Sequence, residues 1–206
     1  MEKRAGTLLI ACGALAREIA ALTRANDWHG LRVHCLPAEL HNRPERIAPA
    51  VREVIRANRE RYAQMFVVYG ECGTGGALDA LLKEEGIERL PGAHCYEFFA
   101  TPQVFAQLAA AEPGTFYLTD FLLRHFERLV VKELGLDRHP ELAQEYFRHY
   151  RRLVYLSQAP QAAAIERARQ IAARFGFDFE HRFTGYGELG TRLAALAGQE
   201  GPACPR

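Results

Sequence analysis

The sequence predicts an α/β protein with a mainly parallel sheet and helices on both faces, in a Rossmann-like three-layer arrangement. The first observation is that short apolar runs alternate with longer segments of helical periodicity along most of the 206 residues. The second is that several apolar runs end in glycine or proline turns, from which a helical segment begins. Strands joined by crossover helices pair in parallel, so a parallel sheet covered on both faces follows from this order.

The predicted strands are short runs rich in Leu, Val, Ile and aromatic residues. They are expected at 7–11, 31–34, 65–69, 115–118, 153–156 and 177–183. Helices are expected at 14–24, 44–62, 77–85, 119–134, 140–150 and 160–174, with a last helix after 184–188. Pro44 suits the first turn of its helix, and Gly86 and Gly135 suit helix ends. Residues 94–99 fit either a short strand or the start of a helix that continues to 108.

Length and composition indicate one α/β domain over 1–197 and a disordered tail over 198–206, since 49% of the residues are hydrophobic and no long linker divides the chain. The net charge of +1, from 26 basic and 25 acidic residues, gives no electrostatic basis for binding nucleic acid or an anionic membrane. No apolar run approaches the roughly 20 residues of a membrane span, and no secretory signal opens the chain. We therefore expect a cytoplasmic protein whose five cysteines are thiols or metal ligands rather than disulfides.

A glycine-rich turn joins the third predicted strand to the next helix. Its residues Gly70, Gly73, Thr74, Gly75 and Gly76 would expose backbone N–H groups at the start of that helix, where anions bind. The turn therefore predicts a small-molecule ligand held by an anionic group. The spacing matches neither nucleotide-binding fingerprint, and the alternative is a tight turn that lets the helix pack closely on the sheet.

Four cysteines share one position relative to the predicted strands. Cys12, Cys35, Cys72 and Cys95 each lie in the last positions of a strand-like run or just after it. Parallel strands lie about 4.8 Å apart and end at the same edge, so these thiols are expected to converge on one metal. Cysteine with histidine suits zinc, which we favour, and several cysteines alone suit an iron–sulfur cluster. No two of the four form a C-x-x-C pair, and buried core cysteines are the alternative.

Two further residues near these loops are candidates for acid–base chemistry. His41 lies in a loop of little apolar character before Pro44, and it is expected to act as a base or a further ligand. The alternative is that the loop only caps the following helix through Asn42. Glu97 follows Cys95 and is a second candidate, although a carboxylate at a helix start is also favoured by the helix dipole.

Several of these segments together resemble a prokaryotic family of unknown function, domain of unknown function sixteen-thirty-eight. The resemblance is carried by residues 9–15, 35–42, 69–76, 91–99, 113–120 and 184–187. It implies no established activity and no residue role. Because such proteins often accompany corrinoid-dependent methyltransferases in anaerobic one-carbon metabolism, it implies a corrinoid protein or a methyltransferase as a partner.

The sequence therefore predicts a metal-binding protein with a Cys/His site at the carboxyl ends of its strands. It would serve as an enzyme or an accessory factor in corrinoid-linked methyl metabolism, since a zinc-bound thiolate remains nucleophilic. One alternative is a non-enzymatic module that binds a cofactor or a partner and whose cysteines only pack. Another is an enzyme that uses Cys72 alone as a nucleophile at a helix start. The residues do not decide whether the protein is an enzyme.

Overall fold

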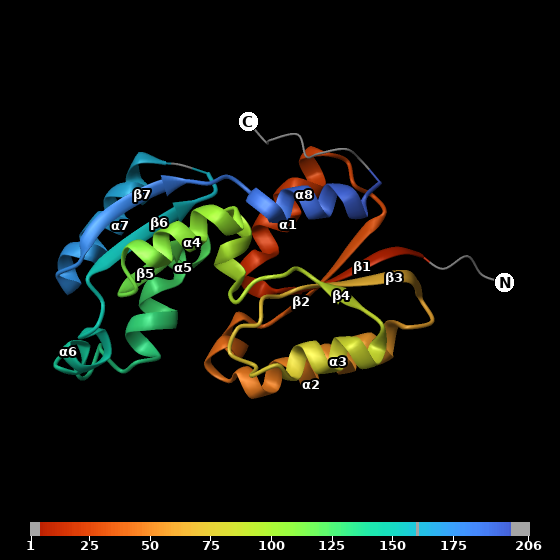
Figure 1. Cartoon of the computed structure of the whole chain (residues 1–206), viewed down its shortest axis with the longest axis horizontal. Helices are drawn as coiled ribbons and strands as arrows, with labels where there is room; N and C mark the ends of the chain where they lie inside the picture. Colours follow the sequence, from red (N-terminus) through yellow and green to blue (C-terminus); the bar gives the residue numbers. More distant parts are fainter. Residues whose placement is uncertain (1–4, 160, 199–206) are drawn as a thin grey trace. The chain divides into compact units, whose positions relative to one another are not determined.

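The computed structural model describes residues 5–159 and 161–198 (Figure 1). Within these ranges the protein is mixed α/β, and every strand pairing is parallel. The predicted α/β class with a Rossmann-like layering is confirmed. The strands form two sheets, one of four strands in the order β2-β1-β3-β4 and one of three in the order β5-β6-β7.

The chain groups into two compact units, Met1–Phe98 with Tyr186–Arg206 and Phe99–Gly185. Each sheet belongs to a unit of its own, and the single domain expected over 1–197 stays a prediction. The boundary at 98–99 carries no proline- or glycine-rich linker, and the boundary at 185–186 falls in the short turn Gly185-Tyr186-Gly187, so composition shows no long linker between the units. Apart from Gly198, the predicted tail over 198–206 lies outside the described residues.

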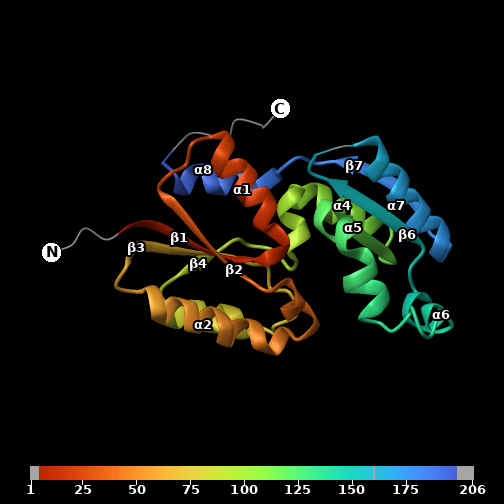
Figure 2. The ribbon, with the colours of Figure 1, turned by 180° about the vertical axis from the view of Figure 1, so that it is seen from behind.

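The first unit is a three-layer arrangement built on the four-stranded sheet. Its strands are β1 (Ala5–Cys12), β2 (Leu31–Leu36), β3 (Tyr62–Val68) and β4 (Glu88–Arg89). Its helices are α1 (Ala16–Ala25), α2 (Ile47–Asn58), α3 (Ala77–Glu85) and α8 (Gly187–Leu196). In Figures 1 and 2, α1 and α8 cover one face of the sheet and α2 and α3 cover the other.

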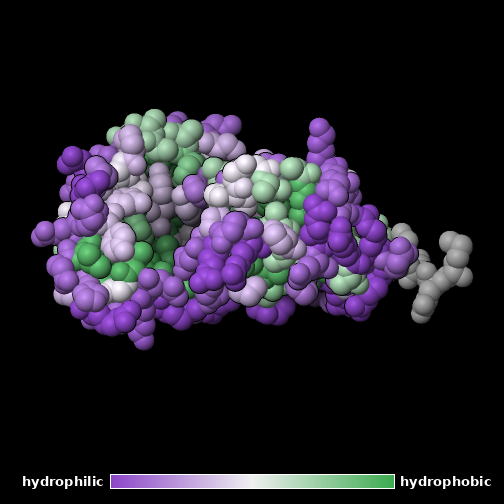
Figure 3. Space-filling view, turned by 90° about the horizontal axis from the view of Figure 1, so that it is seen from below, coloured by the Kyte–Doolittle hydropathy of each residue, from purple (hydrophilic) through white to green (hydrophobic). Residues whose placement is uncertain are grey.

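Burial in the first sheet follows from this layering. The central strand β1 is buried from Leu8 to Cys12 without a break, because helices cover both of its faces. In the edge strand β2, by contrast, only Leu31 and Leu36 at its two ends are buried. The outer sides of α2 and α3 carry charged residues, and Figure 3 shows hydrophilic side chains over much of that face.

The second unit is built on the three-stranded sheet. Its strands are β5 (Thr115–Thr119), β6 (Arg152–Ser157) and β7 (Asp178–Phe183). Its helices are α4 (Pro102–Ala111), α5 (Asp120–Phe126), α6 (Leu142–Phe147) and α7 (Ala162–Phe175), with the π-helical turn η5 (Glu127–Lys132) after α5. Leu153 and Tyr155 pack into a core with α5 and α7, whereas Val154 and Leu156 pack with Leu108 of α4. Because side chains alternate along β6, this strand contributes side chains to the packing on both faces of the sheet.

Several element boundaries differ from those expected. The helix expected to reach residue 62 ends at Asn58, whose side-chain amide donates to the Val54 carbonyl at 2.8 Å, and β3 begins at Tyr62. The ambiguous segment 94–99 contains the short 3₁₀ helix η4 (Cys95–Phe99). The two-residue strand β4 was not expected. Among the described residues, no helix has both the length and the apolar character needed to cross a membrane.

Candidate metal centre

The four strands of the first sheet deliver four chemically active side chains to one edge. Cys12 is the last residue of β1, Cys72 follows β3, and Cys95 follows β4. His41 lies beyond β2 in the 3₁₀ helix η2 (Ala38–Asn42). In the order β2-β1-β3-β4, the chain leaves β1 toward β2 on one side and reaches β3 on the other. The group therefore lies at the topological switch point, where parallel α/β sheets bind their ligands.

The side chains of this group approach one another closely. The Cys12 Sγ lies 3.7 Å from His41 Nδ1, and the Cys95 Sγ lies 3.9 Å from His41 Nε2. The sulfurs of Cys72 and Cys95 are 3.4 Å apart. Ligand atoms of Cys12, His41 and Cys95 all lie within 4.8 Å of one another, so this Cys/His group could hold a metal ion. All three cysteines are buried, and none is in a disulfide.

Local backbone contacts hold Cys12 and His41 in place. The Cys12 sulfur accepts a hydrogen bond from the Ala14 N–H at 3.3 Å, where the chain turns from β1 into a short 3₁₀ helix. His41 Nδ1 lies 3.1 Å from the Ala38 carbonyl oxygen, which can only accept. The imidazole also stacks on the Tyr69 ring, with centroids 6.1 Å apart. With Nδ1–H on a carbonyl, Nε2 is left with a lone pair for a metal, the usual arrangement of a ligating histidine.

The loops that carry Cys72 and Cys95 are joined through their backbones. The Glu71 N–H donates to the Gly92 carbonyl at 2.9 Å, and the Cys72 N–H donates to the Ala93 carbonyl at 2.7 Å. Gly70 packs so closely that a Cβ there would lie 2.8 Å from the backbone of His94. Cys72 itself has a φ of +51°, a left-handed conformation that non-glycine residues rarely adopt. Such strained backbone persists where its surroundings hold it, often at functional sites.

The glycine turn is filled by a carboxylate of the chain itself. Glu71 accepts hydrogen bonds from the Thr74 hydroxyl at 2.6 Å, the Gly73 N–H at 2.8 Å and the Gly76 N–H at 3.0 Å. The Thr74 hydroxyl and then these N–H groups lower the pKa of Glu71 to about 2. The backbone N–H groups that we expected to bind the anionic group of a ligand thus donate to the Glu71 carboxylate instead. Binding of a ligand by this turn and by the adjoining Gly70 and Gly75 stays a prediction.

The ionisable groups of the site bind their protons unequally. A hydrogen bond from Cys95, aided by His41, lowers the pKa of Cys12 to about 5 and that of Cys72 to about 4, although burial opposes both shifts. The same hydrogen bonds, together with burial, raise the pKa of Cys95 well above its ordinary value. Burial alone would lower the pKa of His41, but Cys12 and Cys72 outweigh it and raise that pKa to about 11. Near neutral pH, the metal-free site thus combines two thiolates, one thiol and an imidazolium.

Cys35, the fourth cysteine of the predicted ligand set, stands apart from this group. It is exposed on β2 and pairs with Ala11 rather than with Cys12. Because side chains alternate along a strand, Cys35 shares the face of Ala11, which is opposite to that of Cys12. Burial and the nearby charge of Cys12 raise the pKa of the Cys35 thiol. The structure therefore brings three of the four predicted cysteines together with His41 and leaves Cys35 outside.

Glu97 and Tyr69 lie in the same loops but differ in their contacts with the Cys/His group. The Glu97 carboxylate accepts a hydrogen bond from the His94 N–H at 2.9 Å, which places it on the backbone at the start of η4 rather than in the Cys/His group. Tyr69 was not singled out from the sequence. It is fully buried beside His41, and its hydroxyl has no hydrogen-bond partner among the described residues. The sequence offered one signal for Tyr69, a tyrosine at the end of an apolar strand. The lack of a hydrogen-bond partner for its hydroxyl is visible only in the folded structure.

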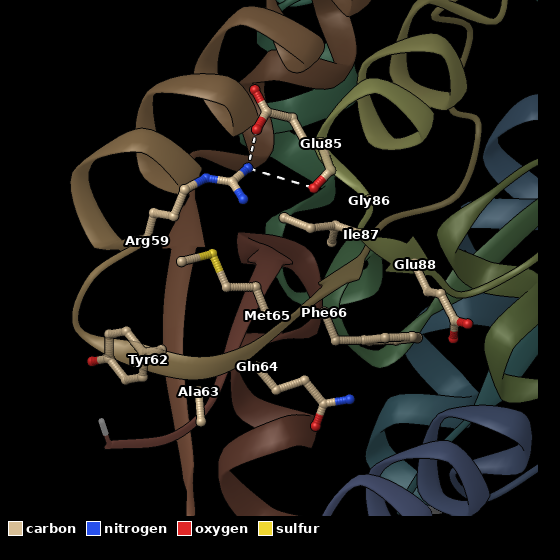
Figure 4. Close-up of a pocket in the computed structure, with 10 residues that line it drawn as sticks. All are labelled: Arg59, Tyr62, Ala63, Gln64, Met65, Phe66, Glu85, Gly86, Ile87 and Glu88. Carbon is tan, nitrogen blue, oxygen red and sulfur yellow. Dashed lines mark hydrogen bonds and ion pairs between the residues drawn. The ribbon is translucent and has the colours of Figure 1, made fainter. Parts of the chain in front are cut away.

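A pocket of about 330 Å³ lies at the other end of β3 (Figure 4). It is lined by residues 59, 62–66 and 85–88. Arg59 and Glu85 form an ion pair across it, as the dashed lines in Figure 4 show. None of the predicted site residues lines this pocket, so it is separate from the Cys/His group at the carboxyl edge.

Comparison with known proteins identifies a family but no activity. A family model described as a protein of unknown function (DUF1638) matches residues 35–193. The matched range includes His41, Cys72 and Cys95, whereas Cys12 precedes it. No curated protein and no solved structure matches the chain.

Proposed function

The chain belongs to the DUF1638 family of proteins of unknown function, since the match spans more than half of its residues, and we propose that it is a metal-binding protein. The proposed ligands are Cys12, His41, Cys72 and Cys95. The observation that carries the proposal is the convergence of three thiols and one imidazole at one edge of the sheet. The Cys95 sulfur lies 3.4 Å from the Cys72 sulfur and 3.9 Å from His41 Nε2, and ligand atoms of Cys12, His41 and Cys95 lie within 4.8 Å of one another. A cation placed among them would neutralise the buried thiolates and displace the remaining protons.

Zinc fits this donor set best. A tetrahedral zinc ion with Zn–S bonds of about 2.3 Å and Zn–N bonds of about 2.0 Å holds its sulfurs roughly 3.8 Å apart and sulfur and nitrogen roughly 3.5 Å apart. The separations of 3.4 Å between the Cys72 and Cys95 sulfurs and of 3.9 Å between the Cys95 sulfur and His41 Nε2 are close to these values. An iron–sulfur cluster spreads its ligands over several metal atoms and needs wider spacing. We therefore place zinc before a cluster as the resident cofactor.

A finer proposal concerns methyl metabolism and rests on the family resemblance together with thiolate chemistry. A zinc-bound thiolate can attack a methyl carbon, forming an S–CH₃ bond while the corrinoid or other leaving group keeps the bonding electron pair. We propose a corrinoid protein or methyltransferase as the partner and the cytoplasm as the location, because a reducing compartment keeps the thiols free. Incubation of zinc-loaded protein with a methylcorrinoid tests this step. A mass gain of one methyl group on a cysteine would support it, and an unchanged mass would contradict it.

The metal site itself is tested by elemental analysis and an absorption spectrum of anaerobically purified protein. We expect about one zinc per chain and a colourless solution, whereas a brown solution would indicate an iron–sulfur cluster. Cys95→Ser is expected to lose the metal, because Cys95 contacts both Cys72 and His41. Cys35→Ser is the matched control and should retain it, since Cys35 is exposed on the opposite face of its strand. Protein without stoichiometric metal, or Cys95→Ser with full metal content, would overturn the proposal.

A further inference from the structure

The hydroxyl of Tyr69 is a buried donor without an acceptor. Tyr69 follows β3 directly, its side chain is 0% exposed, and its oxygen forms no hydrogen bond with the described residues. Buried polar groups in folded proteins are nearly always paired, since an unpaired one loses its bonds to water without replacement. An unpartnered phenol at this position therefore points to an acceptor in the adjoining Cys/His group.

The phenol lies against the proposed metal ligands. Its ring stacks on the imidazole of His41 with an interplanar angle of 18°. Burial raises the pKa of Tyr69, the charges of Cys12 and Cys95 raise it further, and the Cys12 sulfur adds to the shift as an acceptor within reach of the hydroxyl. The hydroxyl is therefore within electrostatic range of the sulfurs.

The Cys12 sulfur is the acceptor that the fold offers to this hydroxyl. Sulfur ligates a metal as the thiolate, which has no proton of its own to donate and is stabilised by donors from the protein. The Cys12 sulfur already accepts from the Ala14 N–H at 3.3 Å. It also lies 3.7 Å from Nδ1 of the His41 ring on which Tyr69 stacks.

We propose that Tyr69 is a positioning residue whose hydroxyl donates a hydrogen bond to the Cys12 thiolate when the metal is bound. This inference rests on the proposed metal site and deepens it. The bond fixes the orientation of Cys12 and withdraws negative charge from its sulfur, as outer-shell donors do in metal sites. Cys12 then becomes the least nucleophilic of the three thiolates, which directs alkylation of the loaded site toward Cys72 and Cys95.

The test compares Tyr69→Phe with the wild type, first without metal and then loaded with zinc or cobalt(II). Because Phe removes only the unpartnered hydroxyl, the metal-free variant should melt at the same temperature as the wild type or higher. Its zinc affinity, measured by competition with a chromogenic chelator, should fall about 10- to 100-fold. The sulfur-to-cobalt charge-transfer band should shift, since one thiolate loses its hydrogen bond. A residue that only packs would produce neither change.

Tyr155→Phe is the matched control. Tyr155 is as deeply buried as Tyr69, but it lies in the second unit and its hydroxyl donates to Asp120 at 2.6 Å. This variant should leave zinc affinity and the cobalt band unchanged. Wild-type zinc affinity and an unshifted band in Tyr69→Phe would overturn the inference while the metal site stands. A wild-type protein that binds neither zinc nor cobalt would overturn the metal site, and the role of Tyr69 with it.

Discussion

The carboxyl edges of the two sheets occupy equivalent positions in their units but carry different chemistry. At the edge of the first sheet, sulfurs and an imidazole converge and one buried hydroxyl lacks a partner. At the edge of the second, the Asp120 carboxylate accepts from the Tyr155 hydroxyl at 2.6 Å and from the N–H groups of Gln158 at 3.3 Å and Ala159 at 3.0 Å. The Gln158 amide in turn accepts from the Asp120 N–H at 3.0 Å.

This difference separates a binding edge from a structural one. The second edge is closed, and even Ser157, which is fully buried, has a partner in His181 at 2.9 Å. A network in which every donor and acceptor is paired makes a fold more rigid and leaves no free hydrogen-bonding group for a ligand. The first edge instead holds a buried donor, the Tyr69 hydroxyl, that has no hydrogen-bond partner among the described residues. The carboxyl ends of parallel strands are where a ligand can bind. Whether the buried polar groups there are already paired indicates whether a ligand is required to complete their bonding.

The largest expected effect is the pH dependence of metal affinity. At pH 7 the metal-free site holds protons on His41, with a pKa of about 11, and on Cys95, whose pKa is raised well above its ordinary value. Cys12 and Cys72, at about 5 and 4, are already thiolates. Binding should therefore release about two protons, and affinity should rise about 100-fold per pH unit near neutrality and fall as the pH falls.

Titration calorimetry in buffers of different ionisation enthalpy measures this proton release directly. Below about pH 5 the slope should steepen, because Cys12 and Cys72 then also take up protons in the metal-free state. Release of three or more protons at pH 7 would mean that the thiols titrate independently. The assignment of two thiolates to Cys12 and Cys72 and one thiol to Cys95 would then be wrong.

An intermediate effect is expected from Asp120→Ala at the closed edge. The substitution leaves the Tyr155 hydroxyl and the N–H groups of Gln158 and Ala159 without their acceptor, which should lower the free energy of unfolding by about 2–3 kcal/mol. Chemical denaturation measures the loss, and metal content should be unchanged. Asp178→Ala, an exposed aspartate on β7, is the control and should stay within about 0.5 kcal/mol of the wild type. Loss of metal in Asp120→Ala would show that the two edges are coupled.

The smallest effect is expected from Glu71→Gln in the glycine turn. Glu71 is largely solvated, so we expect little change in stability and full retention of metal. Removing the carboxylate charge should let the turn bind inorganic phosphate weakly, which the wild type excludes, and phosphorus NMR line widths would report this binding. Glu84→Gln is the control, because the Glu84 carboxylate of α3 forms an ion pair with Arg52 of α2, away from the glycine turn. Phosphate binding by the wild type as tight as by Glu71→Gln would instead support the anion site predicted from the sequence.

The sequence was sufficient for the α/β class and for part of the site. Strand–helix alternation predicts parallel strands, and parallel strands with cysteines at their ends predict sulfurs at one edge, where Cys12, Cys72 and Cys95 do meet. Cys35 shows the limit of this reasoning. Strand β2 continues to Leu36, two residues beyond its expected end, so Cys35 lies within the ladder opposite Ala11. A register is set by long-range pairing, and a difference of one residue reverses the face.

Other features depend on contacts that no local pattern encodes. The division into two units follows from which strands pair with one another. The boundary between the units at Phe98 and Phe99 falls within the continuous 3₁₀ helix η4. Occupation of the glycine turn by Glu71 depends on a side chain folding back over its own loop. The missing partner of Tyr69 is visible only once every neighbour has been placed.

The two backbone hydrogen bonds from residues 71 and 72 to residues 92 and 93 have a kinetic consequence. They extend main-chain pairing beyond the short strand β4, so the gap between two of the sulfurs is fixed before any ion arrives. We therefore expect capture of an ion to require little loss of loop entropy. The rate of loading should then be set by loss of water from the incoming ion and not by folding of the polypeptide around it.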